Sequence, residues 1–288
     1  MKNLPKISIV TPSYNQGEFL EKTICSILDQ NYPNLEYVII DGGSTDGSKK
    51  IIKKYEKYLA HWESVADRGQ SHAINKGFAR TNGQVMAWLN SDDILRPGAL
   101  QLVGSIFAQL KEVSWLTSLP STINDQGYQL YLAQPPFYIQ SFIKRGWYTR
   151  KFMGFVMQEG TFWRRSLWNK AGGGLAEVPY SMDLKLWQSF AKHERLYCVE
   201  ACLASYRLNP NRKNNDNHQK YYREINAWVP EKISLIGKIA WRQIAKLANH
   251  TKINPSIYYD QDKLQWQFRK NLFEVKTFKL LSDSLPRK

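Results

Sequence analysis

The sequence predicts an α/β fold, with a mostly parallel central sheet flanked by helices and a helical C-terminal extension. Three features of the 288-residue chain indicate this class. Apolar runs of strand length alternate with amphipathic helical segments, the runs are rich in Ile and Val, and a polar cluster follows each run. Strands that alternate with helices in this way are typical of βαβ units, in which helices cover both faces of a parallel sheet.

Four strands and three helices are predicted in the first hundred residues. The strands are 7–11, 35–40, 61–66 and 85–89, and the helices are 18–30, 49–59 and 72–81. The apolar side chains of the helices recur every three or four residues, so one face of each helix can pack on the sheet. The third strand, "HWESVA", has the weakest pattern of the four.

The alternation fades beyond residue 100. Residues 100–155 are rich in aromatic side chains and contain no motif. A strand and a helix return in 161–173, which ends in glycines, and a further helix is predicted at 182–192. A polar loop follows from residue 207, and helices are expected from there to the C-terminus.

Composition limits the partners and the compartment. The formal net charge is +15, and roughly 17 Lys and Arg stand against 7 Asp and Glu from residue 207 onward. Such a chain favours polyanionic partners: nucleic acid, anionic lipid or phosphorylated small molecules. Cys25, Cys198 and Cys202 form no metal-ligand pattern and are expected to be free. With no signal peptide and no apolar run of roughly 18 residues, we expect a cytoplasmic protein, and peripheral attachment to the inner membrane face stays open.

Polar clusters follow all four early strands, at the points where the strands end. Residues 11–14 follow the first strand, 41–44 the second, 67–69 the third and 91–93 the fourth. Ligands of open α/β sheets bind outside the carboxyl ends of the strands. These four clusters therefore predict one ligand site at one edge of the sheet.

Adjacent carboxylates occur at the end of the fourth strand, in "VMAWLNSDDI". Asp92 and Asp93 repel each other unless a partner neutralises them. Capping of the next helix is one explanation, and a shared divalent cation is the other. Mg²⁺ and Mn²⁺ prefer carboxylate oxygens, and Mg²⁺ typically binds one or two carboxylates together with substrate phosphates.

The segment "DGGSTDGS" begins with Asp41 at the end of the second strand. Part of it serves as a glycine-rich turn before the next helix. The acidic spacing of a calcium-binding EF-hand loop and the Gly-Lys-Ser/Thr of a P-loop are both absent. Asp41 can accept hydrogen bonds from a nucleotide base or a ribose hydroxyl.

Four ordered motifs now point to a family. "SIVTPSYNQGEFL", "YVIIDGGSTDGS", "DRGQSHAINKGF" and "WLNSDD" together resemble family 2 glycosyltransferases with the GT-A fold. The resemblance is close over about residues 5–100 and continues loosely through "QEGTFWRRSLW" and "MDLKLW" to about 206. It implies a catalytic domain at 1–206, with a nucleotide-sugar half (1–100) and an acceptor half (101–206). Residues 207–288 would form a mobile loop and a basic helical extension.

The resemblance also implies roles on the donor side. Thr11, Pro12 and Tyr14 match the motif that packs around the nucleotide base, and Asp41 matches the acidic residue that recognises it. The second donor segment and its continuation supply Asp67, Arg68 and Asn75.

Metal binding and catalysis are implied in the same way. Asp92 and Asp93 match the family's "DXD" position, with Asp93 as the expected direct ligand of Mg²⁺ or Mn²⁺ and Ser91 in place of the usual first Asp. Asp183, in "SMDLKLW", falls where the family has its catalytic base, and Glu159 is a weaker candidate nearby. The chemistry agrees, because a departing diphosphate needs a counter-charge and an attacking hydroxyl needs a general base.

Arg207 and Lys213 are placed on the polar loop that follows the catalytic domain. In similar enzymes this loop closes over the diphosphate, so Arg207 is a candidate donor-binding residue. Where the family often has His two residues after this Arg, the chain has Asn209, which leaves a metal ligand from the loop in doubt.

The segment 232–250 carries an apolar stripe beside Lys238, Arg242 and Lys246. Such a helix can lie in an anionic membrane interface, or it can pack on the catalytic domain with its basic edge in solvent. Both alternatives stay open.

The function expected from these features is an inverting glycosyltransferase. It would move a sugar from a nucleoside-diphosphate sugar, with UDP-sugars favoured, to the hydroxyl of a lipid-linked or cell-surface glycan. One alternative is a nucleic-acid binding protein, although no binding motif appears and nucleic acid is not an expected partner. The other is a nucleotidyltransferase, although "TPSYNQGEF" lacks the cationic phosphate loop of that class.

Overall fold

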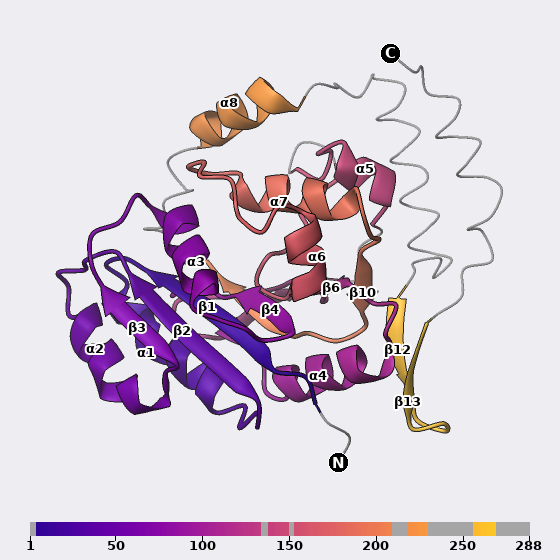
Figure 1. Cartoon of the computed structure of the whole chain (residues 1–288), viewed down its shortest axis with the longest axis horizontal. Coiled ribbons are helices and arrows are strands. Elements are labelled where there is room, and N and C mark those ends of the chain that lie inside the picture. The colour runs from indigo at the N-terminus through magenta and orange to yellow at the C-terminus, as the bar shows by residue number, and fades with distance from the viewer. Residues whose placement is uncertain (1–3, 134–137, 150–152, 209–217, 230–255, 269–288) are drawn as a thin grey trace.

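A nine-stranded sheet runs through the molecule, and helices cover both of its faces (Figure 1). The computed structural model describes residues 4–133, 138–149, 153–208, 218–229 and 256–268. In spatial order the strands are β13 (Gln265–Phe268), β12 (Ser256–Asp260), β10 (Tyr197–Val199), β6 (Trp115–Thr117), β9 (Phe162–Arg164), β4 (Val85–Trp88), β1 (Ile7–Ser13), β2 (Leu35–Asp41) and β3 (His61–Ser64). Strands β9 and β13 run antiparallel to their neighbours, and the other pairs are parallel.

The helices and a second sheet complete the described architecture. The helices are α1 (Gly17–Leu28), α2 (Ser48–Tyr55), α3 (Gln70–Ala79), α4 (Ala99–Gln109), α5 (Gln140–Lys144), α6 (Arg165–Lys170), α7 (Met182–Ala191) and α8 (His218–Trp228), with a short 3₁₀ turn at Glu56–Tyr58. The four-stranded sheet has the order β5 (Ile94–Leu95), β11 (Ala204–Arg207), β7 (Ser121–Ile123) and β8 (Gln129–Leu132).

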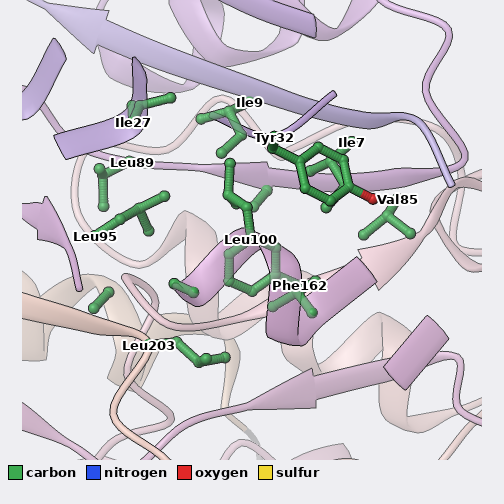
Figure 2. Packing of buried hydrophobic residues seen from close by; sticks show 14 of the residues in the cluster. Ile7, Ile9, Ile27, Tyr32, Val85, Leu89, Leu95, Leu100, Phe162 and Leu203 are labelled. Carbon is green, nitrogen blue, oxygen red and sulfur yellow. The ribbon is translucent and has the colours of Figure 1, made fainter. Parts of the chain in front are cut away.

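One face of the main sheet packs on α1, α2 and α4. Ile7 and Ile9 of β1 point to this face, because successive strand residues point to opposite sides. Figure 2 shows these side chains beside Val85 of β4, Leu100 of α4 and the ring of Tyr32. Burial of this apolar surface is the main force that holds these helices on the sheet.

The other face packs on α3, α5, α6 and α7 through an aromatic cluster. Trp88 of β4 lies 5.5 Å from Trp163 of β9 and 5.9 Å from Trp187 of α7, measured between ring centroids. Trp115 of β6 lies 5.7 Å from the Trp187 ring. Large aromatic side chains dominate core energetics, so this cluster fixes α7, the helix that carries Asp183.

Most of the predicted elements are confirmed. The four early strands, the three early helices, the strand and helix within 161–173 and the helix from 182 all form. Helix α3 begins at Gln70 rather than 72, and α4 lies where the alternation was expected to fade. The three cysteines are free, as expected.

The prediction of helices to the C-terminus is wrong for residues 256–268. These residues form a β-hairpin, and β12 pairs in parallel with β10. The indole Nε1 of Trp266 donates to Ser105 Oγ of α4 over 2.6 Å. The hairpin and its aromatic residues instead extend the edge of the sheet.

Two further expectations fall partly or wholly outside the described residues. The amphipathic segment 232–250 and Lys213 lie outside them. Within the described ranges, no helix is long and apolar enough to cross a membrane. Helix α8 confirms a helix directly after the polar segment.

Helix α3 approaches the sheet at Gly77. A Cβ atom built at this position would lie 2.4 Å from Val10 Cγ1 and 3.0 Å from its Cγ2. Such distances do not occur between real carbon atoms, so only glycine lets α3 lie this close to β1. This contact sets how closely the C-terminal part of α3 lies on β1.

We expect Gly77→Ala to destabilise the fold by about 1–3 kcal/mol, because the added methyl overpacks the interface. Helix propensity alone would have the opposite effect, because alanine in place of glycine would stabilise the helix by about 1 kcal/mol. Urea unfolding of Gly77→Ala, Val10→Ala and the double variant checks this. Val10→Ala removes the clashing methyls, so the double variant should lose less free energy of unfolding than the two single variants together. Strictly additive losses would contradict the proposed contact.

Candidate active site

The loops that follow the first three strands meet at Gly42. A Cβ atom at Gly42 would lie 3.2 Å from Asp67 Oδ2 and 3.3 Å from Tyr14 Cδ2. Strands β1, β2 and β3 are parallel neighbours, so their carboxyl ends share one edge of the sheet. This edge is where ligands of open α/β sheets bind.

The first-strand motif presents one aromatic ring to solvent. Tyr14 is 63% exposed, whereas Thr11 and Pro12 are buried within β1. Thr11 Oγ1 accepts a hydrogen bond from the hydroxyl of Tyr37 on β2 over 3.0 Å. Thr11 and Pro12 therefore shape the strand end, and Tyr14 offers a ring face on which a planar ligand group can stack.

Asp41 is fully buried at the end of β2. Its Oδ2 accepts the backbone N–H of Ser44 over 2.9 Å, that of Gly43 over 3.2 Å and the hydroxyl of Ser64 over 2.7 Å. The Ser44 hydroxyl donates to Oδ1. This carboxylate thus holds the 42–44 loop and the end of β3 together.

The second donor segment contacts the stretch that leads into α7. Asp67 Oδ1 accepts the N–H of Gly69, and Arg68 forms an ion pair with Glu177 at 2.8 Å. The hydrogen bonds from Arg68 hold the pKa of the Glu177 carboxyl below its usual range. Asn75 on α3 makes two hydrogen bonds to the backbone of Leu175, over 2.9 and 2.7 Å.

The acidic turn after β4 is organised by Asn90. Its Oδ1 accepts Gln70 Nε2 over 2.7 Å, and its Nδ2 donates to Asp93 Oδ2 and to Gln158 Oε1, both over 3.2 Å. Gln158 in turn donates to the carbonyl of Trp88. Asn90 thus ties the acidic turn to α3 and to the chain before β9.

Arg207 lies beneath this turn, with 1% of its surface exposed. Its Nε donates to the carbonyl of Asp92, and its Nη1 donates to the carbonyls of Asn124 and Asp125, each over 2.8 Å. Its backbone N–H donates to Asp93 Oδ1 over 2.9 Å. The placement of Arg207 on a polar loop is wrong, because β11 pairs with β5 and β7 and draws the residue into the core.

The acidic turn fits a metal that a substrate helps to hold. Asp92 is 5% exposed and Asp93 is fully buried. Within the described ranges, no group of three or more His, Cys, Asp or Glu side chains could hold an ion. Magnesium needs only one or two carboxylates when substrate phosphates supply the other ligands, so two adjacent carboxylates suit it.

Asp183 lies in the first turn of α7. Burial raises the pKa of its carboxyl group to about 6, and the nearby charge of Glu224 adds to this, although the N–H of Leu184 favours the charged form. Glu224, on α8, accepts hydrogen bonds from the N–H and hydroxyl of Ser181. A carboxylate with a raised pKa suits a general base near neutral pH.

The first turn of α3 connects Asp183 with the acidic turn. Ser71 Oγ lies 2.9 Å from the sulfur of Met182, the residue before Asp183. The adjacent Gln70 donates to Asn90 of the acidic turn. The acidic turn and the residue before Asp183 are therefore both held by the first turn of α3, through adjacent residues.

Some residues of this arrangement were not identified from the sequence. Asn90 and Gln70 stand inside the recognised motifs, at positions to which no role was given. Gln158 directly precedes Glu159, which is itself buried. No sequence pattern pointed to Glu224, because a glutamate in a predicted helix of a basic region is usually an ordinary surface charge.

Comparison with known proteins identifies relatives by sequence. The sequence model of Glycosyl transferase family 2 matches residues 8–167. TuaG of Bacillus subtilis (strain 168), a glycosyltransferase that its name provisionally assigns to teichuronic acid biosynthesis, is 29% identical over 224 residues, which cover 71% of this chain and 79% of TuaG.

Solved structures share the fold. TarS of S. aureus (residues 1–349), in complex with UDP-GlcNAc, superposes with a TM-score of 0.61 at 15% identity, covering 86% of this chain and 73% of TarS. The mannosyltransferase PcManGT of Pyrobaculum calidifontis, in complex with GDP-Man and Mn²⁺, gives a TM-score of 0.59 at 15% identity and covers 86% of this chain and 71% of PcManGT. These likenesses show the GT-A fold for this chain.

We expect Arg207→Met to destabilise the protein by about 2–4 kcal/mol, since three backbone carbonyls lose a buried, charged donor. Thermal and urea unfolding measure this loss. Lys22→Met is the matched control, because Lys22 Nζ also reaches the carbonyl of Asp125, at 3.5 Å, from an exposed position. The control should change stability by less than about 0.5 kcal/mol. Equal losses in the two variants would contradict the assigned role of Arg207.

Proposed function

Because the chain belongs to glycosyl transferase family 2 and is a glycosyltransferase, we propose that it moves a sugar from a nucleoside-diphosphate sugar to a hydroxyl acceptor with inversion. One observation carries the proposal. A carboxylate of raised pKa, Asp183, and the acidic turn at Asp92 and Asp93 flank the same first turn of α3. This arrangement supports a general base close to the site of the leaving diphosphate, as a single displacement requires.

The donor in this proposal occupies the carboxyl edge of strands β1 to β4. Tyr14 stacks on the base, while Thr11, Pro12 and Asp41 shape the pocket that receives it. Support comes from TarS and PcManGT, whose structures hold UDP-GlcNAc and GDP-Man. We favour a UDP-sugar. Residues 1–100 form the nucleotide-sugar half, and residues 101–206 form the acceptor half.

Asp67, Arg68 and Asn75 act at the border of the donor site. Arg68 and Asn75 join the donor half to residues 175–177, which lead to the helix of the base. These contacts set the position of Asp183 relative to the donor. Arg207 acts on the donor through the acidic turn that it supports.

The proposed cofactor is Mg²⁺ or Mn²⁺, held by the acidic turn. Asp93 already accepts N–H groups from Arg207 and Asn90. We propose that Asp92, the more exposed of the two carboxylates, makes the direct contact and that Asp93, which is fully buried, shapes the turn, which reverses the order expected from the motif. A bound divalent ion would stabilise the negative charge that develops on the leaving diphosphate. PcManGT, whose structure is in complex with GDP-Man and Mn²⁺, supports this choice.

Asp183 accepts the proton of the acceptor hydroxyl as that oxygen forms its bond to the anomeric carbon. The bond from the anomeric carbon to the diphosphate breaks on the opposite face, which inverts the centre. Glu159 is also buried, but it directly follows Gln158, which is hydrogen-bonded to Asn90 of the acidic turn. Glu159 is therefore not assigned this role. The acceptor is proposed to be a cell-surface or lipid-linked glycan, and the name of TuaG supports this class.

We expect Mn²⁺ to strengthen donor binding in the wild-type protein and not in Asp92→Asn. Thermal shift with a panel of UDP- and GDP-sugars, with Mn²⁺ or EDTA, measures this. Removing the ligand leaves the diphosphate charge without its counter-ion, so the Mn²⁺-dependent shift should disappear. Asp93→Asn should lower the melting temperature without ligand and keep part of the Mn²⁺ response. The reverse pattern would return the direct contact to Asp93.

We expect Asp183→Asn to bind donor normally and to lose about 10²–10⁴-fold in transfer rate, the usual contribution of a general base. Wild-type activity should rise with pH through about 6, because the base must be deprotonated. Steady-state kinetics from pH 5 to 8 test both statements. Normal transfer by the variant would refute the assignment.

The same variant tests the raised pKa through stability. The folded pKa of about 6 lies above the ordinary 3.8, so ionisation of Asp183 costs stability as pH rises from about 4 through 6. Asp183→Asn should therefore be more stable than wild type at pH 8, with the difference vanishing near pH 4. Urea unfolding at both pH values measures it.

A further inference from the structure

A cavity of about 330 Å³ lies beside α7, outside the proposed donor site. Ligand pockets span roughly 300–1,000 Å³, so its volume admits one small group. The α7 side chains that line it run from Lys185 to Lys192, and the opposite walls include Lys144, Gly174 and Trp228. The cavity begins within one helical turn of Asp183.

Three lysines line this cavity, and no carboxylate does. Lys144 comes from α5, and Lys185 and Lys192 come from α7 and its C-terminal cap. In the part of the chain that the structure describes, none of the three ammonium groups has an ion-pair partner. Lys185 Nζ instead lies 5.0 Å from the ring centroid of Trp228.

Apart from Asp183, the carboxylates on the neighbouring segments are engaged elsewhere. Glu177, on the segment that forms one wall, pairs with Arg68. Glu224 accepts three hydrogen bonds from Tyr180 and Ser181. Glu194, just beyond α7, pairs with Lys170 at 3.7 Å. Three like charges around one hollow repel each other, and an anion bound between them would relieve this repulsion.

The wall of the cavity is continuous with the proposed active site. Gly174 and Ala176 flank Leu175, which is hydrogen-bonded to Asn75 on α3. On the other side, α7 carries Asp183 in its first turn. Asp183 and Lys185 stand two residues apart on α7, so an acceptor held at Asp183 is the ligand expected to reach the lysine cavity.

We propose that this cavity binds an anionic group, a phosphate or a carboxylate, of the sugar acceptor. The inference rests on the proposed function for the identity of its ligand. It narrows the acceptor to a hydroxyl-bearing glycan that carries negative charge close to the accepting hydroxyl. A concave cavity with converging ammonium groups suits a discrete anion better than the flat surface of a bilayer.

Binding of inorganic tripolyphosphate, measured by calorimetry at low salt, tests the cavity without reference to activity. The variant Lys144→Gln/Lys185→Gln/Lys192→Gln should bind it about tenfold more weakly, as expected for the loss of three modest ion pairs. The matched control is Lys49→Gln/Lys50→Gln/Lys53→Gln, which makes the same charge change on the exposed face of α2. Equal weakening in both triple variants would overturn the proposal.

Kinetics with two acceptors, an oligosaccharide phosphate and its dephosphorylated counterpart, test the role of the anion. The cavity variant should raise KM for the phosphorylated acceptor about tenfold, with kcat retained, and the effect should shrink in high salt. KM for the uncharged acceptor should not change. The double variant Lys144→Gln/Lys192→Gln leaves the Lys185–Trp228 contact intact and should also raise KM for the phosphorylated acceptor. This result would show that the effect of the triple variant does not come from misfolding.

Two outcomes separate this inference from the proposed function. If the wild-type protein hydrolyses no nucleotide sugar and transfers none, the proposed function fails, while tripolyphosphate binding still decides whether the cavity takes anions. If the cavity variant loses binding to phosphatidylglycerol vesicles but keeps the wild-type KM for the phosphorylated acceptor, the anion belongs to a membrane and the acceptor assignment is overturned.

Discussion

The guanidinium of Arg207 supports the turn on which the candidate site depends. It donates to three backbone carbonyls, one of them at Asp92, while its own backbone N–H fixes Asp93. The ring of Phe19, in α1, lies 4.9 Å from the guanidinium carbon. A buried cation beneath two adjacent carboxylates offsets part of their repulsion. The chain can therefore hold an acidic turn in its interior before any ligand arrives.

Helix α3 transmits this geometry to the other half of the site. Gly77 sets how closely the helix lies on β1, and Gln70 and Ser71 at its first turn reach the acidic turn and the start of α7. The tryptophan cluster holds α7 from the opposite side. The arrangement of the candidate site thus depends on packing within the core more than on loops at its rim.

The early strands and helices could be predicted from the sequence because their apolar residues form short runs in the strands and recur every three or four residues in the helices. The ligand edge followed from the polar residues after those strands, and Tyr14 and Asp67 do meet there at Gly42. Arg207 could not be placed, because strand pairing with β7 is a long-range contact that local polarity does not reveal. Likewise, the hairpin that contains Tyr258 and Trp266 could not be predicted, because β12 forms by pairing with β10, which is distant in the sequence.

The hairpin of β12 and β13 bears on where this protein can be divided. Ile257 is fully buried against the sheet, and Cys198 and Val199 of β10 pair with β12. A fragment that stops at the apparent end of the catalytic region would leave that strand with an open edge, and open edges pair with other chains. Fragments made for crystallisation should therefore retain residues up to at least 268. The β12–β13 hairpin covers the edge of β10, which would otherwise be open to pairing with another chain.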